Sequence, residues 1–596
     1  MDTKVFYGRK RKDLHVREIP SDSEDSEIDS NASDEELIAE QAIGGGEDEA
    51  IDDDETVEDQ EDQEDDQEND PSHGRSNSTQ TPRWKTSHIP ASSEYPEWTG
   101  ILQHSGDIQS PYRYFKRFFS DDLIESIVQE TNLFSVQQNP AKPLDLTVDE
   151  LEQFLGTVMY MSLFRLPATR MYWSRSTRVA QVADVMSLTR WEAIKRCLHF
   201  NDNNSLPTRE MPNFDELYKI RPLLDHILPK LREIPMQEML CVDEQMVPFK
   251  GKSRIKQYLP SKPKKWGYKI LLLCGSNGIP YNLEVFVGKA VHPPELADIG
   301  ASGNVVLRLA EPIPKHQNFK MFFDNWFTSV KLMHVLAQQG IHCVGTVRLN
   351  RLPGSCMAKE EDLKKAGRGS FQEKTALVGS TELHAVRWYD NRSVTLLSTY
   401  QGAQPMSQVD RWDKRQKKVI QVACPAVVST YNRHMGGVDL LDSLIALYRI
   451  HIRSKKWYHR LVFHVIDLVV VTSWLLYRQD CVESGMARGD HMALYAFKSE
   501  VAQSLCKFQK EGKKRGRPSG IAQKYEEKKR RQGPTAPIPN HDVRLDKTSH
   551  WPIMADKKGR CRVPGCRGTP KVMCGKCNVH LCFTAQSNCF MNFHME

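Results

Sequence analysis

The sequence lacks any Lys or Arg between residues 21 and 70, although the whole chain holds 81 of them. That stretch holds 25 Asp and Glu residues instead, and such one-sided charge opposes collapse into a packed core. We therefore predict that residues 1–95 form a disordered acidic arm. Ser21, Ser23 and Ser26 lie among its carboxylates. They are candidates for an acid-directed kinase, with a merely solvated tail as the alternative.

The formal net charge of +4 hides a sharp division along the chain. Residues 1–70 hold 6 basic and 28 acidic residues, a net charge of −22. The other 75 basic and 49 acidic residues leave +26 for residues 71–596. An acidic arm joined to a basic body indicates a polyanionic partner, most often nucleic acid. We expect the arm to compete weakly for the same basic surface and so to limit non-specific DNA binding.

Long apolar runs and regularly spaced cysteines are also scarce. The start of the chain has no apolar run, so we expect no secretory signal. The most apolar stretch, Leu461–Tyr477, contains His464 and Asp467, which indicates a buried helix and no membrane partner. Of the 14 cysteines, six crowd between Cys561 and Cys589. A metal-binding module in a reducing compartment explains this better than a disulfide framework.

The pattern of apolar and polar residues along the chain predicts an α/β multidomain protein. Helical periodicity dominates residues 105–237, with recurrent Lys and Arg that fit either a DNA-facing domain or ordinary solvated faces. From residue 238 the pattern changes to apolar strands, in the order β-β-β-α-β-α-β up to residue 348. This order suits a mixed sheet with helices packed on it. Residues 349–423, with a hairpin around Asp390 and Asn391, are predicted to be an inserted small β-domain.

A basic linker, residues 506–555, follows a second helical stretch that ends near residue 505. Its two basic clusters predict a bipartite import signal and hence nuclear localisation. The clusters are Lys513, Lys514 and Arg515, and Lys528, Lys529, Arg530 and Arg531. Arg515 and Arg517 also match the core of an AT-hook, which places arginines in a narrow A·T minor groove. A purely solvated linker is the alternative.

Three aspartates are placed where a catalytic site can form. Asp243 and Asp324 each end an apolar run that is typical of a strand, and Asp439 opens a helical segment. An Asp after apolar strand residues is costly unless it is exposed, paired or bound to metal. Acids from two strands and a helix can meet at one edge of a mixed sheet, where two Mg²⁺ ions about 3.5–4 Å apart would serve phosphoryl transfer. Taken singly, each aspartate has a structural alternative.

A series of short motifs surrounds these acids. They are Val242-Asp243-Glu244, Gln257-Tyr258-Leu259-Pro260-Ser261-Lys262-Pro263, Gly267-Tyr268-Lys269, Asp324-Asn325-Trp326-Phe327-Thr328-Ser329, Gly345-Thr346-Val347-Arg348, Trp388-Tyr389-Asp390, Val394–Thr399, Tyr431-Asn432 and Gly437-Val438-Asp439. In these motifs and their order, the chain resembles the piggyBac-type transposases and their domesticated relatives. The resemblance runs from about residue 110 to the C-terminus.

The resemblance implies a ribonuclease-H-like catalytic core at residues 238–348 and 424–445. Its DDD triad, which would also hold the magnesium ions, falls on Asp243, Asp324 and Asp439, with Asp442 as a nearby fourth carboxylate. A dimerisation and DNA-binding domain would flank the core, at residues 105–237 and 446–505. Lys262, Lys264, Lys265 and Lys269 lie soon after the first strand, where phosphates would approach or where they are ordinary solvated charges.

The activity that the resemblance implies is cut-and-paste transposition by a homodimer. Such an enzyme binds the terminal inverted repeats of a transposon, frees 3′-OH groups and passes through hairpin ends. It then joins the double-stranded DNA at TTAA sites. The intact acids favour an active enzyme over a domesticated nuclear DNA-binding protein without transposition.

The last residues carry eight soft or borderline metal ligands within 34 positions, enough for two tetrahedral zinc ions. A cross-brace pairing predicts one ion on Cys561, Cys566, His580 and Cys582, and a second on Cys574, Cys577, Cys589 and His594. A domain this short, residues 559–596, needs metal to fold. The resemblance implies a zinc domain that binds DNA ends. A RING or PHD finger, acting as ubiquitin ligase or chromatin reader, is the competing interpretation, although the interval before His580 is short for a RING.

Overall fold

The structure, a computed structural model, describes residues 82–86, 96–102, 108–260, 265–288, 298–413, 416–507 and 538–595. The predictions for the acidic arm, for Lys262 and Lys264, and for the basic linker concern residues outside these ranges. The linker residues in question are Lys513, Lys514, Arg515, Arg517, Lys528, Lys529, Arg530 and Arg531. Nuclear import, minor-groove contact and phosphorylation therefore stay predictions.

Helices occupy the first long described segment, as the sequence periodicity predicts. They are α2 (Pro111–Lys116), α3 (Asp121–Gln138), α4 (Val148–Phe164), α5 (Ala180–Ala183), α6 (Leu188–Cys197) and α7 (Arg221–Arg232). Helix α4 begins with a capping box, in which the Thr147 hydroxyl accepts a hydrogen bond from the Glu150 backbone N–H at 3.2 Å. Gly156 lets α4 approach α14 (Leu494–Lys507), because a Cβ there would stand 2.6 Å from the Cys506 sulfur. Helices far apart in the sequence thus pack together.

The longest described helix, α13 (Trp457–Glu483), is apolar and long enough to cross a membrane by length and composition alone. Yet 94% of its most apolar 18-residue stretch is buried inside the protein, and α2 and α14 pack against the helix. Asp467 lies buried within α13 and pairs with Lys498 of α14 at 2.9 Å. A buried ion pair and surrounding helices are what a core helix shows, as the sequence predicts.

A ten-stranded mixed sheet is built from β1, which precedes these helices, and from nine strands that follow them. Its strands are β1 (Lys85–Thr86), β2 (Met239–Pro248), β3 (Gln257–Tyr258), β4 (Trp266–Gly275), β5 (Pro280–Val285), β6 (Phe319–Phe323), β7 (Ile341–Thr346), β8 (Phe371–Val378), β9 (Thr381–Tyr389) and β10 (Ser393–Ser398). The strand order is β1-β8-β9-β10-β7-β6-β2-β4-β3, and β5 also pairs with β4. The β2–β6 and β6–β7 pairs are parallel and the rest are antiparallel.

The predicted elements of the core occur in the predicted order, and the structure adds the two-residue strand β3 between the first two of them. Helices α8 (Ala301–Leu309) and α9 (Val330–Gln338) occupy the connections that lead into the parallel strands β6 and β7. The prediction of a separate small β-domain at residues 349–423 is wrong for most of that segment. Strands β8, β9 and β10 continue the core sheet, because β10 pairs with β7 through the Leu397–Gly345 register. Within the described part of this segment, only β11 (Ser407–Asp413) and β12 (Lys418–Cys424) form a sheet of their own. Helix α10 (Glu360–Ala366) precedes β8.

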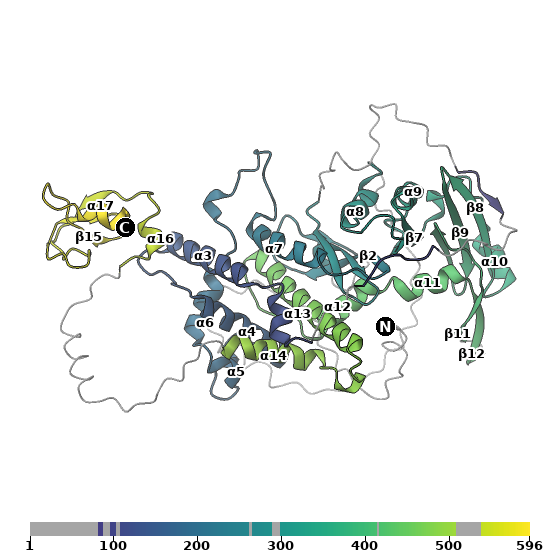
Figure 1. The fold of residues 1–596 in the computed structure, drawn as a ribbon, viewed down its shortest axis with the longest axis horizontal. Helices are drawn as coiled ribbons and strands as arrows, with labels where there is room; N and C mark the ends of the chain where they lie inside the picture. Colours follow the sequence, from purple (N-terminus) through teal and green to yellow (C-terminus); the bar gives the residue numbers. More distant parts are fainter. Residues whose placement is uncertain are drawn as a thin grey trace, which may run out of the picture. The chain divides into compact units, whose positions relative to one another are not determined.

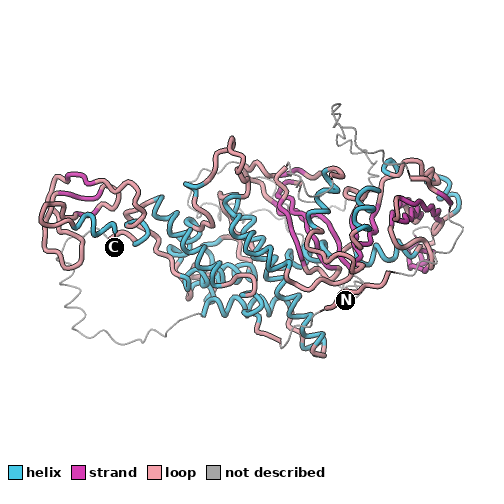
Figure 2. The backbone as a smooth tube through the Cα atoms, turned by 45° about the horizontal axis from the view of Figure 1, so that its top comes forward, coloured by secondary structure: helices cyan, strands magenta, loops and turns pink. Residues whose placement is uncertain are grey.

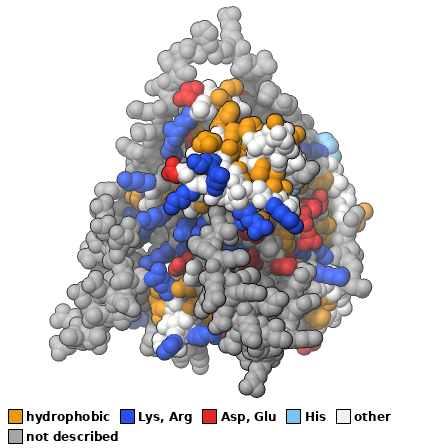
Figure 3. All heavy atoms as spheres, turned by 90° about the vertical axis from the view of Figure 1, so that its left-hand side faces the viewer, with side chains coloured by type: hydrophobic (Ala, Val, Ile, Leu, Met, Phe, Trp, Pro, Cys, Tyr) orange, Lys and Arg blue, Asp and Glu red, His pale blue; other side chains and the backbone are white. Residues whose placement is uncertain are grey.

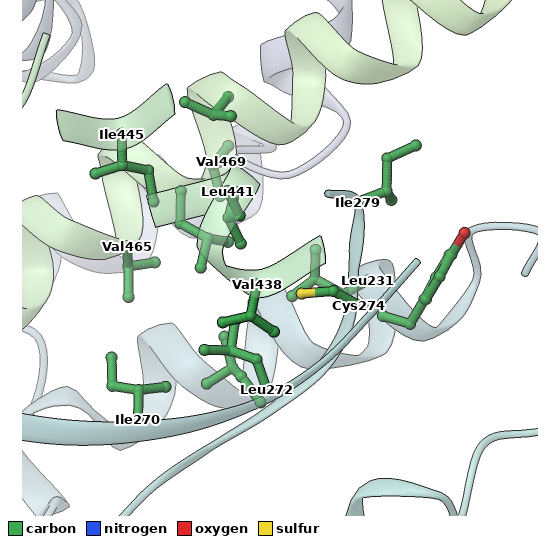
Figure 4. Packing of buried hydrophobic residues seen from close by; sticks show 14 of the residues in the cluster. Leu231, Ile270, Leu272, Cys274, Ile279, Val438, Leu441, Ile445, Val465 and Val469 are labelled. Atoms are coloured by element: carbon green, nitrogen blue, oxygen red, sulfur yellow. The ribbon is translucent and has the colours of Figure 1, made fainter. Parts of the chain in front are cut away.

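The two faces of the sheet carry different helices. Helices α11 (Ala426–His434), α12 (Gly437–Leu447) and α13 contact β2 on one face, and Figure 1 shows α8 and α9 on the other. Figure 2 shows the strands beside the helices that cover them. In Figure 4, Val438 and Leu441 of α12 and Val465 of α13 lie over Ile270 and Leu272 of β4. This apolar interface fixes α12 against the middle of the sheet.

A small module closes the described chain. It contains α16 (His541–Arg544), β13 (Pro552–Met554), β14 (Val572–Cys574), β15 (Val579–His580) and α17 (Cys589–Met595). The three strands form an antiparallel sheet, and the module has a core of its own. Six of the nine buried core residues are not ordinary large apolar side chains, since five are cysteines and one is the small Val579. Apolar packing alone therefore gives this module little stability.

Candidate active site and metal-binding module

Asp243 lies in the middle of a strand. The sequence predicted that the first strand ends at this acid, but β2 continues to Pro248 and pairs with β4 along its whole length. Because side chains alternate along a strand, Asp243 shares a face with Cys241 and Gln245, the face that α12 covers. The carboxylate therefore points into the interface between the sheet and α12.

Asp324 directly follows the neighbouring parallel strand, as predicted. Val242 of β2 pairs with Phe323 of β6, and Asp243 and Asp324 are the residues that directly follow this pair. A tight turn holds Asp324, whose Oδ1 accepts the backbone N–H of Trp326 at 2.9 Å. The sequence reasoning missed the residue that holds this turn, Arg351, whose Nη1 donates to the carbonyls of Asn325 (2.8 Å), Trp326 (2.9 Å) and Thr328 (3.2 Å).

Asp439 reaches the same place from α12. It lies in the first turn of the helix, where the positive end of the helix dipole stabilises a carboxylate. Gly437 makes the approach possible, because a Cβ there would stand 2.3 Å from the Gly275 carbonyl oxygen and 2.7 Å from the Cys241 sulfur. The structure thus brings Asp243, Asp324 and Asp439 together from two strands and one helix.

Burial and neighbouring negative charges change the pKa values of these carboxylates. Burial raises the pKa of Asp243 to about 7, and the negative charges of Glu244, Asp324 and Asp439 add to the rise. Burial likewise raises the pKa of Asp324, with Glu244 as a further cause. Tyr431 of α11 lies within the same field, since Asp324 and Asp243 help burial to raise its pKa. The sequence singled out Tyr431 only as part of a motif, because nothing local shows that it faces the acids.

This arrangement predicts that Asp243 destabilises the metal-free protein at neutral and alkaline pH. Its folded pKa of about 7 exceeds the unfolded value of about 3.8, so the folded state binds the extra proton between these values. Stability therefore falls as pH rises from about 4 to about 7. We expect Asp243→Asn in chelator to melt at a higher temperature than the wild type at about pH 8, with a difference that shrinks towards pH 4. Equal melting curves at pH 8 would contradict this.

Two other predicted site residues pair with oppositely charged side chains. Asp442, the expected fourth carboxylate, lies one turn after Asp439 and pairs with Arg449 at 2.8 Å, while its Oδ1 also accepts from Gln245 at 3.3 Å. Lys269, expected to meet phosphates, is buried and pairs with Glu244 at 3.3 Å. Lys265 is exposed and stays available to a polyanion.

The C-terminal module gathers eight ligands into two groups that could each hold a metal ion. One consists of His550, Cys574, Cys577 and His594, and the other of Cys561, Cys566, Cys582 and Cys589. Within each group the ligand atoms lie within 4.8 Å of one another. The sulfur of Cys566 lies 3.8 Å from that of Cys582 and 3.6 Å from that of Cys589. A tetrahedron with metal–sulfur bonds of about 2.3 Å has edges of about 3.8 Å, so the spacing fits zinc.

The grouping corrects the sequence prediction at two ligands. His550 replaces His580, because Pro552 pairs with Cys574 and brings the nearby His550 Nδ1 to 3.4 Å from the Cys574 sulfur. His580 pairs with Met573 and so lies on the opposite face of β14 from Cys574, with its ring against Gly559. Figure 1 labels β15 and α17 in this module.

The second corrected ligand is Cys589, which joins the all-cysteine group. It lies five residues before His594 on α17, so the two side chains point about 140° apart around the helix axis. One ion cannot easily bind both. The other six predicted ligands stay together as two sets of three, Cys561, Cys566 and Cys582, and Cys574, Cys577 and His594.

Hydrogen bonds behind both histidines orient them as metal ligands. His550 directs Nδ1 towards Cys574 and Cys577, while its Nε2 lies 2.9 Å from the Asp546 carboxylate. His594 directs Nε2 towards Cys577 at 3.5 Å, while its Nδ1 lies 2.6 Å from the Phe590 carbonyl oxygen. Such partners fix the tautomer and ring orientation of ligating histidines. The donor set is therefore that of a soft, tetrahedral cation.

Comparisons with known proteins place this arrangement in context. Residues 110–474 match a family model described as Transposase IS4. The human PiggyBac transposable element-derived protein 2 is 29% identical over 513 residues, which span 84% of this chain and 80% of that protein. The human PiggyBac transposable element-derived protein 3 is 29% identical over 496 residues, which span 82% and 77%.

A solved structure shares the fold. It is a cryo-EM structure of the piggyBac transposase synaptic complex with hairpin DNA, matched with a TM-score of 0.56 and 22% identity. The match covers 80% of this chain and 97% of that chain.

Proposed function

This chain belongs to the piggyBac-type transposase family, and from that premise we propose that it is a DDD-type cut-and-paste DNA transposase. The observation that carries the proposal is the meeting of Asp243, Asp324 and Asp439 from two adjacent parallel strands and one helix. The core would be ribonuclease-H-like, with β5, β4, β2, β6 and β7 as its five strands.

The acids suit a pair of Mg²⁺ ions. Mg²⁺ prefers oxygen ligands. The negative charges of residues around Asp243 favour a bound cation. Among the described residues, the groups whose ligand atoms all lie within 4.8 Å of one another belong to the C-terminal module. The three aspartates are not one of these groups, so they form a more open site. Mg²⁺ commonly takes few carboxylates and completes its shell with water and substrate phosphate. When bound, the ions would activate the attacking oxygen and stabilise the leaving one.

The protein's own residues position this chemistry. Arg351 fixes the turn after Asp324 through three carbonyls, and Gly437 seats the first turn of α12 on the sheet. Both contacts hold the carboxylates with little freedom, as phosphoryl transfer requires. The reaction proposed is cleavage of double-stranded DNA at terminal inverted repeats, passage through hairpin ends and joining at TTAA sites.

The proposal includes DNA binding by a nuclear homodimer. Figure 3 shows a face on which many Lys and Arg side chains lie beside hydrophobic ones. The C-terminal module would bind two zinc ions and contact DNA ends, and its ligand geometry supports zinc over a harder cation. Nuclear import through the basic linker and dimerisation through the helical regions belong to the same proposal.

Excision in vitro tests the function. Purified protein with Mg²⁺ and a donor plasmid carrying matched terminal repeats is expected to release the element and leave a restored TTAA junction. Asp324→Ala serves as the control, because the carboxylate follows a strand and its loss leaves the sheet pairing intact. Absence of excision by the wild type across matched ends, with intact DNA binding, would defeat the transposase proposal.

A second function is favoured by the relatives that the chain resembles. Two of them are named as proteins derived from a transposable element. The alternative is therefore a domesticated nuclear DNA-binding protein that keeps the scaffold without transposition. In the excision experiment this protein would bind specific DNA and release nothing, with the wild type and Asp324→Ala behaving alike.

A further inference from the structure

The segment that runs from β2 through β4 into β5 has an unusual composition. From Gln245 to Leu283 the sequence has no Asp or Glu and has eight Lys and Arg residues. Tyr258 and Trp266 stand among these cations and remain 47% and 49% exposed. Large aromatic side chains normally lose most of their exposure on folding, so a pair of them at a basic site needs an explanation.

Their exposure is not the result of loose backbone. Tyr258 of β3 and Trp266 of β4 are direct cross-strand partners, and their ring centroids lie 4.8 Å apart. Backbone hydrogen bonds brace both sides, from Leu259 N–H to the Lys265 carbonyl at 2.8 Å and from Phe249 N–H to the Trp266 carbonyl at 3.0 Å. The fold therefore holds the two rings together at the surface.

Positive charge surrounds the pair. The Lys256 Nζ lies 4.5 Å from the centroid of the Trp266 ring, and Lys265 is exposed next to it in the chain. From outside this segment, the Glu216 carboxylate reaches Arg254 at 3.9 Å. A surface of aromatic faces and cations favours a ligand that has both flat rings and negative charge.

Trp266 lies on the same face of the sheet as Asp243. Directly opposed residues of an antiparallel pair lie on one face of a sheet, and Asp243 opposes Leu272 of β4. Trp266 is six residues before Leu272, so it lies on the same face as Asp243 and about 20 Å along the strand. That distance corresponds to about six nucleotide steps of a DNA strand.

We propose that Tyr258 and Trp266 form a stacking platform for an unpaired base of bound DNA, with Lys256 and Lys265 contacting the flanking phosphates. The inference deepens the proposed function and rests on it. Bases of an intact duplex already stack on each other, so the platform takes a base exposed at an opened, nicked or overhanging end. Aromatic stacking of this kind is tolerant of sequence and works together with a basic groove.

Binding of full-length protein to two DNA probes tests the platform. One probe is a short duplex with a single-stranded overhang containing 2-aminopurine, and the other is the same duplex fully paired. We expect Trp266→Ala and Tyr258→Ala to weaken binding of the overhang probe about tenfold and to leave the paired probe unchanged. Wild-type protein should quench the 2-aminopurine fluorescence, Trp266→Phe should retain the quenching, and Trp266→Ala should lose it.

Two matched variants separate stacking from charge and from general surface effects. Trp412→Ala removes a tryptophan that is 59% exposed on β11, and it should leave both probes unaffected. Lys256→Ala should flatten the salt dependence of single-strand binding by about 0.7 in the logarithmic slope, whereas Trp266→Ala should not change that slope.

The outcomes are distinguishable. Equal binding and quenching by wild type and Trp266→Ala, in protein that still excises its element, overturns the platform alone. Equal weakening of both probes also overturns it, because the effect then reports general DNA contact. If the wild type binds neither probe nor terminal-repeat DNA, the proposed function falls together with the platform.

Discussion

Removal of bound metal with a strong chelator is expected to unfold residues 538–595 of the full-length protein and to leave the sheet and its helices folded. The module's core holds few large apolar residues besides Leu581, Phe590 and Phe593, and its other members are chiefly cysteines. Structural zinc supplies about 10–16 kcal/mol of binding free energy in comparable small domains. That exceeds what so small an apolar core contributes. Hydrogen exchange measured peptide by peptide checks the result.

The two histidines provide the matched pair for this prediction. His550→Ala should lower the zinc content from two ions per chain towards one, because His550 belongs to a ligand group. His580→Ala should keep both ions, because the His580 ring packs on Gly559 outside either group. Elemental analysis of the purified variants measures both. A protected module after chelation, or zinc loss in His580→Ala alone, would refute the grouping.

Replacement of Asp439 by Asn is expected to lower DNA cleavage by about a thousandfold, while Asp442→Asn stays within about tenfold of the wild type. Both residues lie on α12, so the two variants alter the same helix by the same atom exchange. Asp439 adds its charge to Asp243 across the interface with β2. Asp442 is instead held by Arg449 and Gln245. Under the proposed function, Asp439 would hold metal, whereas Asp442 would position its helix.

Single-turnover cleavage of a terminal-repeat duplex, at saturating Mg²⁺, measures this difference. Urea unfolding of each variant shows whether lost activity reflects lost structure. Asp442→Asn is expected to be the less stable of the two, because it removes the negative charge that pairs with the largely buried Arg449. Equal loss of cleavage in both variants, without loss of stability, would make Asp442 a member of the site.

Local sequence predicted the scaffold of the site well. Apolar runs with turn residues between them identified β2, β4, β5, β6 and β7, and helical periodicity identified α8 and α9. Asp324 was correctly placed at a strand end, since the apolar run stops there. Asp243 was misplaced at a strand end, because the polar Glu244 and Gln245 interrupt the apolar pattern while the backbone continues to pair with β4.

The extent of the sheet could not be predicted in the same way. The hairpin of β9 and β10 is visible in the sequence, but its pairing with β7 joins residues about 50 positions apart. Nothing local distinguishes a separate small sheet from an extension of the core. The same reason hides the turn-holding role of Arg351, which depends on three carbonyls that precede it by more than 20 residues.

The sequence by itself determined the candidate residues, namely two acids after apolar runs, a third at the start of a helical segment, and a dense set of zinc-type ligands. These depend on side-chain chemistry and local periodicity, which are written along the chain. Only the tertiary structure decided that His550 belongs to a group that could hold a metal ion and His580 does not, that Asp442 pairs with Arg449, and that Tyr258 contacts Trp266. Each of these depends on atoms brought within a few ångströms by strand register and helix direction, which spacing along the chain does not fix.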